Sequence, residues 1–338
     1  MTGIDEVARL AGVSTATVSR ALSGNGPVSP ATRERVQSAA STLGYVVSSN
    51  ASSLASGRTR NVGVVVPFLS RWFFSSVVEG AEAALLGHGY DLTLYNLSGG
   101  EESRRSVFDQ FLLRKRVDAV IAVALELTDD EVSRLLALHK PLVGIGGPIP
   151  GVPTLTLDDL AVAQLATEHL ISLGHTQIAH IGAGVEFDLD FHLASTRRRG
   201  FERAMHDAGL TIRDDLYQPA DFTIRGGYEA AKQLLGRPYD RPTAIFAASD
   251  EMAIGCLLAA RDLGLSVPRD VSIVGIDDHE LAEFFGLTTV AQFPRQQGRL
   301  AVDVLMDALQ PESDDAATLN RELPFQLVVR SSTARLAD

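Results

Sequence analysis

The chain has 338 residues, of which 45% are hydrophobic, and a net charge of −12. This length indicates more than one domain. No apolar run reaches the roughly 20 residues of a membrane span, and the N-terminal residues lack the pattern of a secretory signal. The single cysteine, Cys256, excludes an internal disulfide, and the eight histidines have no metal-ligand spacing. We therefore expect a cytoplasmic protein without a cofactor or metal site, with Cys256 as a small core residue.

The charges are distributed unevenly along the chain. Residues 1–60 contain six arginines, no lysine and three acidic residues, a net charge of +3 that leaves −15 for the remainder. A basic N-terminal segment on an acidic body predicts that contacts with phosphate are made by the N-terminal part.

Residues 4–22, IDEVARLAGVSTATVSRAL, predict two short helices joined by a tight turn. Gly12 lets the chain reverse because it tolerates a positive φ, and Ser14 is placed to cap the second helix. The outward positions of that helix carry small or hydrogen-bonding side chains and one arginine: Thr15, Ala16, Thr17, Ser19 and Arg20. Such a face suits the major groove of DNA, where arginine bonds O6 and N7 of guanine, although other amphipathic helix pairs look similar.

A third helix is predicted from Ser29-Pro30 to about Leu43, so that residues 1–46 form a three-helix headpiece with a small core. Residues 47–60 then form a hinge rich in serine and glycine, with one large apolar side chain, Leu54, in its middle. This segment is either a flexible tether or a helix that forms on docking, with Leu54 inserted into the minor groove.

From Val62 onward the chain alternates between apolar strands and amphipathic helices, which is typical of parallel α/β folds. Strands are predicted near 62–66, 90–95, 119–124, 142–145, 178–181, 244–247, 271–275 and 326–329, and helices near 75–87, 101–114, 129–139, 159–172, 195–208, 225–235 and 250–263. The rhythm restarts after Asp158, which predicts two side-by-side parallel sheets with a cleft between them. We expect an N-subdomain of about 61–158 and 290–318 and a C-subdomain of about 159–289 and 319–338.

The headpiece, hinge and double α/β body together resemble the lac/gal repressor (LacI-type) family of bacterial transcription regulators along essentially the whole chain. The resemblance is carried by residues 4–22 and by LASGRT at 54–59, LGHTQIAHIG at 173–182, TRRRGF at 196–201, FAASDEMAIG at 246–255 and VSIVGIDD at 271–278. It implies a homodimer that binds near-palindromic double-stranded operator DNA. It also implies a body of the periplasmic-binding-protein type whose cleft holds a small effector, with sugar as the first expectation, and a repressor controlled allosterically by that effector.

The resemblance also assigns residues. Thr15, Ala16 and Arg20 look like the base-reading residues, and Leu54 looks like the hinge wedge. The implied effector site contains an aromatic pair after the first strand, an effector-bonding arginine, a stacking phenylalanine and two cleft carboxylates: Phe73, Phe74, Arg197, Phe222, Asp250 and Asp277. The hinge departs from the family, because Val47 and Ser48 replace a common Pro-Asn pair and Ser52 replaces a common arginine.

Other interpretations of these residues stay open at this point. Arg197 lies in a basic run that is also typical of a solvated helix face, and Phe73 and Phe74 are also compatible with a core. Asp250 is equally compatible with a helix N-cap. Asp277 ends a strand, where ligands of α/β proteins bind, which favours a functional role. An arginine suits an anion as well as a sugar, so a purine or a phosphorylated sugar is an alternative effector.

Parts of the sequence are also compatible with two other classes of function. A solute-binding transport protein would share the body, but the basic headpiece and the missing signal pattern argue against it. An enzyme is disfavoured because the chain contains no P-loop, GxSxG or HExxH motif, and the glycines at 182 and 184 lack the third glycine of a dinucleotide loop. The sequence leaves open the effector's identity, the operator and whether the effector releases or promotes DNA binding.

Overall fold

The computed structural model describes residues 3–23, 26–45, 57–112, 116–184, 193–309 and 320–336. The chain divides into two compact units, Met1–Arg60 and Asn61–Asp338. Within the described ranges, no helix is both long and apolar enough to cross a membrane.

The first unit contains the three predicted helices, α1 (Ile4–Ala11), α2 (Thr15–Ser23) and α3 (Pro30–Thr42). Their shared core is small: Val7, Val18 and Val36 have no exposed surface, and alanines fill most of the remaining space. So small a core limits the stability that burial can contribute to the headpiece.

The ends of these helices follow the predicted chemistry. Gly12 adopts a left-handed conformation after α1, with φ of 66°. The Ser14 hydroxyl accepts a hydrogen bond from the Thr17 N–H at 3.2 Å, and the Ser29 hydroxyl accepts one from the Thr32 N–H at 3.3 Å. These caps satisfy N–H groups that a helix start leaves without an internal partner.

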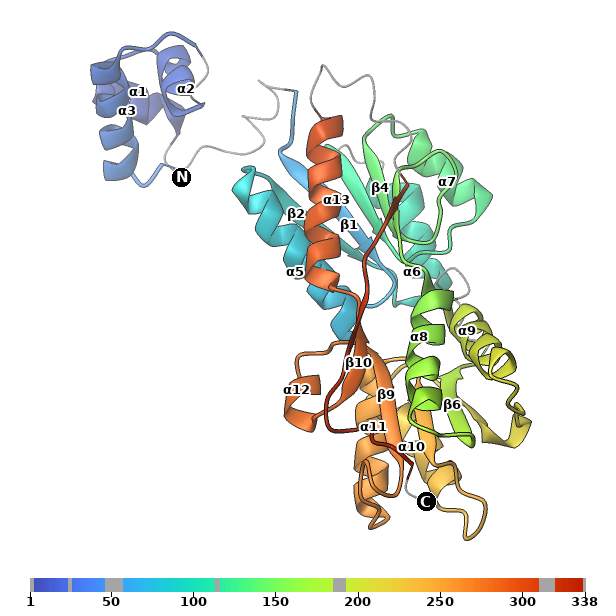
Figure 1. Cartoon of the computed structure of the whole chain (residues 1–338). Coiled ribbons are helices and arrows are strands. Elements are labelled where there is room, and N and C mark those ends of the chain that lie inside the picture. The colour runs from blue at the N-terminus through green and yellow to red at the C-terminus, as the bar shows by residue number, and fades with distance from the viewer. Residues whose placement is uncertain are drawn as a thin grey trace. The chain divides into compact units, whose positions relative to one another are not determined.

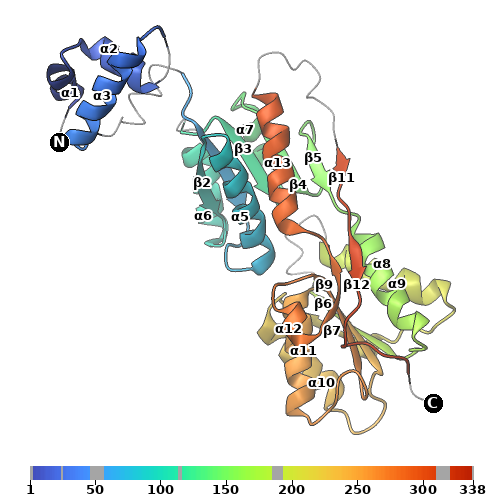
Figure 2. The same ribbon diagram turned by 60° about the vertical axis from the view of Figure 1, so that its left-hand side comes forward.

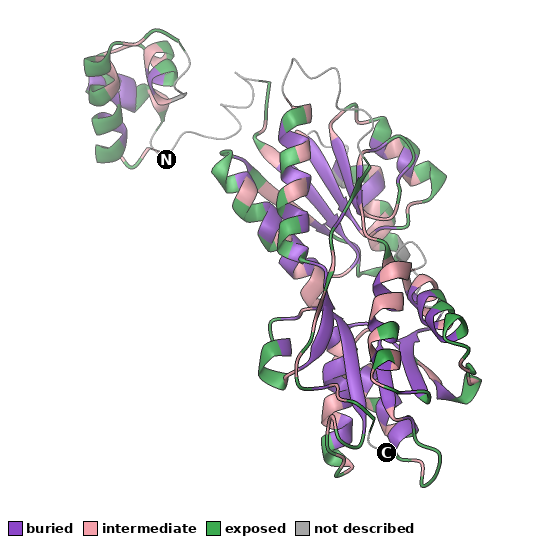
Figure 3. Cartoon of the chain, in the orientation of Figure 1, coloured by how far each residue is buried: buried purple, intermediate pink, exposed green. Residues whose placement is uncertain are grey.

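The second unit begins with a six-stranded parallel sheet in the order β11-β5-β4-β3-β1-β2. Its strands are β1 (Asn61–Val66), β2 (Asp91–Asn96), β3 (Ala119–Val123), β4 (Leu142–Gly146), β5 (Thr154–Thr156) and β11 (Arg321–Glu322). The central strands β1, β3 and β4 are almost completely buried (Figure 3), as expected for parallel strands covered on both faces.

Helices cover both faces of this first sheet (Figures 1 and 2). One face packs against α5 (Trp72–Gly87) and α13 (Pro294–Ala308), and the other packs against α6 (Gly100–Ser106), the π-helical segment η1 (Val107–Phe111) and α7 (Asp129–Leu136). Helices α5 and α13 can approach closely because Gly80 and Gly298 have no side chain at their contact. A Cβ on Gly80 would lie 2.0 Å from the Arg295 carbonyl oxygen, and a Cβ on Gly298 would lie 2.0 Å from the Val77 carbonyl oxygen. Helix α13 is an element that the sequence interpretation did not identify.

The second sheet has the order β12-β10-β9-β8-β6-β7, in which only the edge strand β12 is antiparallel. Its strands are β6 (Ile178–Ala183), β7 (Tyr217–Ala220), β8 (Ala244–Ala247), β9 (Ser272–Asp277), β10 (Thr288–Ala291) and β12 (Gln326–Val328). Helices α8 (Asp159–Ser172) and α9 (Leu193–Asp207) cover one face, while α10 (Ile224–Leu235) and α11 (Asp250–Asp262) cover the other. The short elements η4 (Asp214–Leu216) and α12 (Ala282–Phe285) complete this part.

The chain passes between the two sheets three times, after β5, after β10 and after β11. The second crossing follows Ala291, where β10 leaves the second sheet, and the third follows Glu322, where β11 ends its pairing with β5 in the first sheet.

Candidate DNA-recognition face and effector cavity

The outward face of α2 carries the five residues predicted to meet DNA. Ala16, Ser19 and Arg20 are exposed, and Thr15 and Thr17 are half-exposed, whereas Val18 between them is completely buried. The Arg20 side chain lies along its own helix, with Nε donating to the Ala16 carbonyl at 3.2 Å. The face therefore has little bulk and one cationic fork, which is compatible with close approach to a groove.

The hinge residues lie outside the described residues. This applies to Leu54, the predicted minor-groove wedge, and to Val47, Ser48 and Ser52, where the sequence departs from the family pattern. Their roles stay predictions.

A cavity of about 320 Å³ lies between the two subdomains of the second unit. It is lined from the first subdomain mainly by Pro67, Phe68, Arg71, Phe73, Phe74, Gly146, Gly147, Pro148 and Gln297, and from the second by Asp159, Thr196, Arg197, Asp221, Phe222, Ser249, Glu251 and Asp277. Five of the six predicted effector residues line this cavity, and Asp250 does not.

Arg197 is buried, in contrast to its neighbours in the same basic run. Its Nε donates to Asp159 at 2.9 Å, and Nη1 donates to the Ala248 carbonyl at 2.5 Å. Arg198 instead pairs with Glu202 on its own helix. The solvated-face interpretation is therefore wrong for Arg197, because the helix turns this one arginine inward beside the cavity. Loss of solvent raises the pKa of Asp159, and the adjacent Arg197 opposes that rise.

Asp277 ends strand β9 and presents a buried carboxylate at the cavity wall. Burial raises the pKa of Asp277 well above its usual range, an effect that Arg197 opposes and Asp250 reinforces. The Gln292 side-chain amide donates to this carboxylate. The backbone of Asp277 has φ of 130°, a strained value for a residue with a side chain, and such strain is concentrated at functional positions.

The predicted aromatic residues come from both subdomains. Phe73 and Phe74 form an edge-to-face pair at the start of α5, with ring centroids 5.4 Å apart. Phe74 also belongs to the core under α5, so the core and pocket interpretations both apply to it. Phe222 precedes α10 and has a left-handed φ of 56°. The cavity lining therefore combines aromatic rings with charged side chains.

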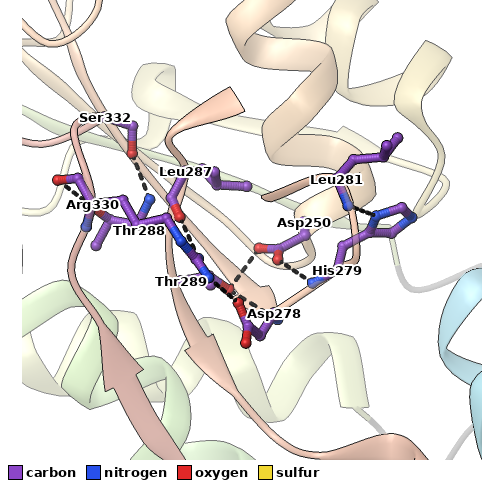
Figure 4. Close-up of polar contacts among 9 residues, drawn as sticks. All are labelled: Asp250, Asp278, His279, Leu281, Leu287, Thr288, Thr289, Arg330 and Ser332. Carbon is purple, nitrogen blue, oxygen red and sulfur yellow. Dashed lines mark hydrogen bonds and ion pairs between the residues drawn. The ribbon is translucent and has the colours of Figure 1, made fainter. Parts of the chain in front are cut away.

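Asp250 lies in the interior of the second subdomain, at the first turn of α11 (Figure 4). Its side chain is fully buried and accepts hydrogen bonds from the His279 N–H at 2.8 Å and the Thr289 hydroxyl at 2.7 Å. Burial raises the pKa of Asp250 to about 7. The helix cap is the preceding Ser249, whose hydroxyl accepts the Met252 N–H, so the N-cap interpretation of Asp250 is also wrong.

Several polar residues that line the cavity were not predicted from the sequence. Arg71 directly precedes the aromatic run, and Asp159 follows the first crossing of the chain, so either one could have been noticed from its position. Gln292 and Gln297 flank the start of α13, which the sequence pattern did not reveal. Among the residues that the structure describes, no cluster of histidine, cysteine or acidic side chains is arranged to hold a metal ion.

Two family models match the chain. Residues 3–48 match "Bacterial regulatory proteins, lacI family", and residues 167–333 match "Periplasmic binding protein-like domain". The first match covers the helical headpiece and the second covers most of the α/β body.

Curated relatives match along nearly the full length. The HTH-type transcriptional repressor PurR of Vibrio vulnificus (strain CMCP6) is 34% identical over 99% of this chain and 100% of its own. The ribose operon repressor of Escherichia coli (strain K12) is 36% identical over 90% of this chain and 92% of its own. Both are named as repressors, in agreement with the expectation that this chain is not an enzyme.

Solved structures agree in fold and in coverage. The lac repressor dimer bound to operator and the anti-inducer ONPF superposes with a TM-score of 0.84 at 27% identity, covering 98% of this chain and 99% of that one. A complex of the transcriptional regulator CelR with cellobiose has a TM-score of 0.70 at 32% identity, covering 98% and 100%. A LacI family regulator from Enterococcus faecium with bound ribose has a TM-score of 0.70 at 27% identity, covering 82% and 100%.

The predicted fold class, an N-terminal helix-turn-helix headpiece with two α/β subdomains of the periplasmic-binding-protein type, is thereby confirmed. The chain belongs to the LacI family of bacterial transcription regulators and is a DNA-binding repressor with an effector-binding domain.

Proposed function

We propose that this protein is a homodimeric repressor that binds a palindromic operator and is controlled by a small neutral sugar in the cavity between its subdomains. The single observation that carries the choice of effector is the state of Arg197. This arginine is already bonded to the Asp159 carboxylate and the Ala248 carbonyl, so its charge is balanced within the protein.

The charges around the cavity support a neutral ligand. The lining contains five carboxylates, from Asp158, Asp159, Asp221, Glu251 and Asp277, against two arginines, Arg71 and Arg197. The raised pKa of Asp277 favours its neutral form, but the remaining carboxylates still outnumber the arginines. A phosphorylated ligand would therefore meet an excess of negative charge and would also lose its own hydration. Carboxylates and amides are suitable partners for sugar hydroxyls, because they accept and donate hydrogen bonds at fixed positions.

The apolar part of the lining supports a sugar of modest size. Phe73, Phe74 and Phe222 offer ring surfaces against which the CH faces of a sugar can pack. The cavity volume of about 320 Å³ lies at the lower end of the roughly 300–1,000 Å³ seen for ligand pockets. Related regulators have been solved with ribose and with cellobiose. A purine is the second candidate, because aromatic walls also suit a planar base and one relative is the repressor PurR.

We assign operator recognition to the exposed face of α2. Arg20 would bond one guanine, while Thr15, Ala16, Thr17 and Ser19 would allow close contact with neighbouring bases and phosphates. Two headpieces of a dimer would read half-sites about 34–36 Å apart, and Leu54 would enter the minor groove between them. Binding to operator DNA supports a cytoplasmic location. The lac repressor, which shares this fold, is a dimer on its operator.

The homodimer is supported by an apolar surface on the second subdomain. Phe284 in α12 is 84% exposed, and Leu281 and Phe285 beside it are also exposed. A second copy of this chain would cover these side chains. Phe284→Asp should therefore convert the dimer into a monomer in sedimentation experiments, whereas Tyr239→Asp, at an equally exposed site in the α10–β8 loop, should leave the dimer intact.

The experiment that tests the effector is thermal unfolding of the full chain against neutral mono- and disaccharides, sugar phosphates and purines, followed by operator binding with each hit. A ligand present at 100 times its Kd should add about 2.7 kcal/mol to the free energy of unfolding. The proposal expects stabilisation by one neutral sugar and a change of operator affinity with the same sugar, since the two affinities are linked reciprocally by about 1–3 kcal/mol. Stabilisation only by purines or only by phosphorylated compounds would reject the sugar.

A further inference from the structure

Two consecutive residues of the first subdomain reach across to the second at the rim of the cavity. The Arg71 guanidinium donates to the Asp221 carbonyl at 2.9 Å and to the Phe222 carbonyl at 3.3 Å. The neighbouring Trp72 ring packs on the His279 ring with centroids 4.7 Å apart and planes inclined by 33°. Since Arg71, Asp221 and Phe222 all line the cavity, these contacts lie at its edge.

The electrostatics of a third residue of the second subdomain also involve Arg71 and Trp72. Burial raises the pKa of Glu251, at the start of α11, and the charge of Arg71 and the Trp72 backbone both oppose that rise. On the side of the first subdomain, the Arg71 guanidinium lies 5.9 Å from the centre of the Phe68 ring. The Arg71 side chain therefore lies between the Phe68 ring of the first subdomain and the Asp221 and Phe222 carbonyls of the second.

The His279 ring that receives Trp72 is fixed in place by buried hydrogen bonds (Figure 4). Asp250 accepts the His279 N–H at 2.8 Å, and the His279 Nδ1 accepts the Leu281 N–H at 3.0 Å. The Thr289 hydroxyl donates to Asp250 and accepts the Asp278 N–H at 3.3 Å. Because Asp277 and Asp278 have strained φ values of 130° and 55°, this segment keeps its shape through such bonds rather than by backbone preference.

We propose that Arg71 and Trp72 form a latch, closing on the Asp221–Phe222 carbonyls and on His279, that holds the effector cavity shut and sets how fast the effector leaves. Asp250 is a positioning residue for the latch: it does not line the cavity, but it bonds the His279 N–H and so fixes the loop that follows Asp277 and presents His279. Opening the cavity breaks two charge-assisted hydrogen bonds and a ring contact at once, so the latch biases the subdomains toward the closed arrangement in which the cavity is complete.

The latch rests on the proposed effector site, but it has a readout that needs no effector. Trp72 is the only tryptophan in the chain, so the intrinsic tryptophan fluorescence reports the surroundings of this one ring, which packs on His279. We would measure acrylamide quenching of Trp72 in the full-length protein and in Arg71→Ala, His279→Ala and the double variant. Arg225→Ala is the control, since Arg225 is an exposed arginine paired with Glu229 on its own helix.

We expect the quenching constant to rise at least two-fold in Arg71→Ala and in His279→Ala, and to stay unchanged in Arg225→Ala. The quenching constant of the double variant should be little higher than that of either single variant, because each change alone opens the same contact. An Arg71→Ala variant whose Trp72 is shielded as in the wild type would overturn the latch. The latch would also be overturned if the effects of the two single substitutions on the quenching constant simply added in the double variant, because two independent contacts give that result.

The second measurement uses the neutral sugar that stabilises the wild type. Arg71→Ala should bind that sugar about ten-fold more weakly, mainly through faster release, while Arg225→Ala should bind it normally. An unchanged release rate in Arg71→Ala would contradict the role of the latch in holding the effector. If no neutral sugar stabilises the wild type, the proposed effector class fails, whereas the quenching results still decide the latch.

Discussion

Arg20 in the headpiece and Arg197 in the body are both assigned to binding, but they are built into the protein in opposite ways. Arg20 is exposed and bonds only to its own helix at the Ala16 carbonyl, among the described contacts. Arg197 is buried, pairs with Asp159 and bonds the Ala248 carbonyl. The headpiece thus displays its binding residues on top of a small core, whereas the body uses its binding residues as part of the core. A substitution of a binding residue in the headpiece should therefore weaken binding without changing stability. A substitution of a binding residue in the body should lower both.

The largest effect is expected from Arg197→Ala. Removing one partner of a buried ion pair costs about 3–5 kcal/mol, because the other charge stays buried and unpaired. The unfolding free energy should fall by that amount, and the response of operator binding to effector should be lost. Arg198→Ala is the matched control: its exposed pair with Glu202 should contribute at most about 1 kcal/mol. Equal losses in the two variants, measured by denaturant unfolding, would contradict the comparison.

Arg20→Ala should weaken binding to the cognate operator by about 1–3 kcal/mol and relax the preference at one guanine. The unfolding free energy should stay within about 0.5 kcal/mol of the wild type, since Arg20 is a surface residue. Titrations with cognate and mismatched operators measure the first effect, and thermal unfolding measures the second. A loss of equal size on every operator sequence would remove Arg20 from base recognition.

The body should also respond to pH through a buried histidine. His180 packs between Phe201 and Phe246, its Nδ1 bonds the Phe246 carbonyl at 3.1 Å, and its Nε2 has no partner among the described residues. Burial lowers the pKa of His180 from 6.5 to about 4. Because the unfolded chain takes up the proton first, stability should fall as the pH drops from 6.5 toward 4, by about 2 kcal/mol between pH 7 and pH 5.

Asp250 acts in the opposite direction over the same range, since its pKa is raised to about 7 and the folded state takes up its proton first. The His180 contribution is therefore measured as the difference between the wild type and His180→Gln, which has no titrating ring. Parallel stability curves for the two proteins between pH 5 and pH 7 would contradict this prediction, because they would show that the pKa of His180 is the same in the folded and unfolded states.

The smallest effect concerns the capping of the headpiece. Ser29→Ala removes the side-chain bond to the Thr32 N–H and should cost about 1 kcal/mol of headpiece stability. Hydrogen exchange of the α3 amides in the full-length protein measures this loss. Ser41→Ala, at an exposed position of the same helix, should cost nothing. Faster exchange in the body amides of Ser29→Ala would contradict the separation of the two units.

The sequence predicted the elements that have a regular apolar period. The long helices α8, α10 and α11 and the apolar strands β1 and β3 begin and end within a few residues of their predicted bounds. Strands β5, β7, β10 and β11 have two to four residues and contain polar residues, and they were missed, whereas the equally short β8 is entirely apolar and was predicted. Helix α13 was missed although it is long, because a mixed polar composition and its position beyond the predicted α/β rhythm hid its packing against α5.

The candidate site was predicted in part for a related reason. Residues that end a strand or follow one, such as Asp277 and Phe73, lie where parallel sheets bring ligands, so their position alone was informative. Asp250 also follows a strand, but its carboxylate turns toward Thr289 and His279 instead of the cavity. Arg71 acts across the subdomain boundary, on the Asp221 carbonyl. A contact between residues 150 positions apart produces no local sequence pattern from which it could be predicted.

The three crossings between the sheets mean that neither subdomain is a continuous piece of chain. The first sheet needs β11 and its covering helix α13 from the C-terminal fifth of the protein, while the second sheet is completed by β10 and β12 on either side of that same helix. A gene fragment cut at residue 158 would encode a sheet that lacks its edge strand β11 and one of the two helices that cover one of its faces. Recombination between relatives should therefore preserve the body as one inherited module, and the natural point of exchange is the boundary between Arg60 and Asn61.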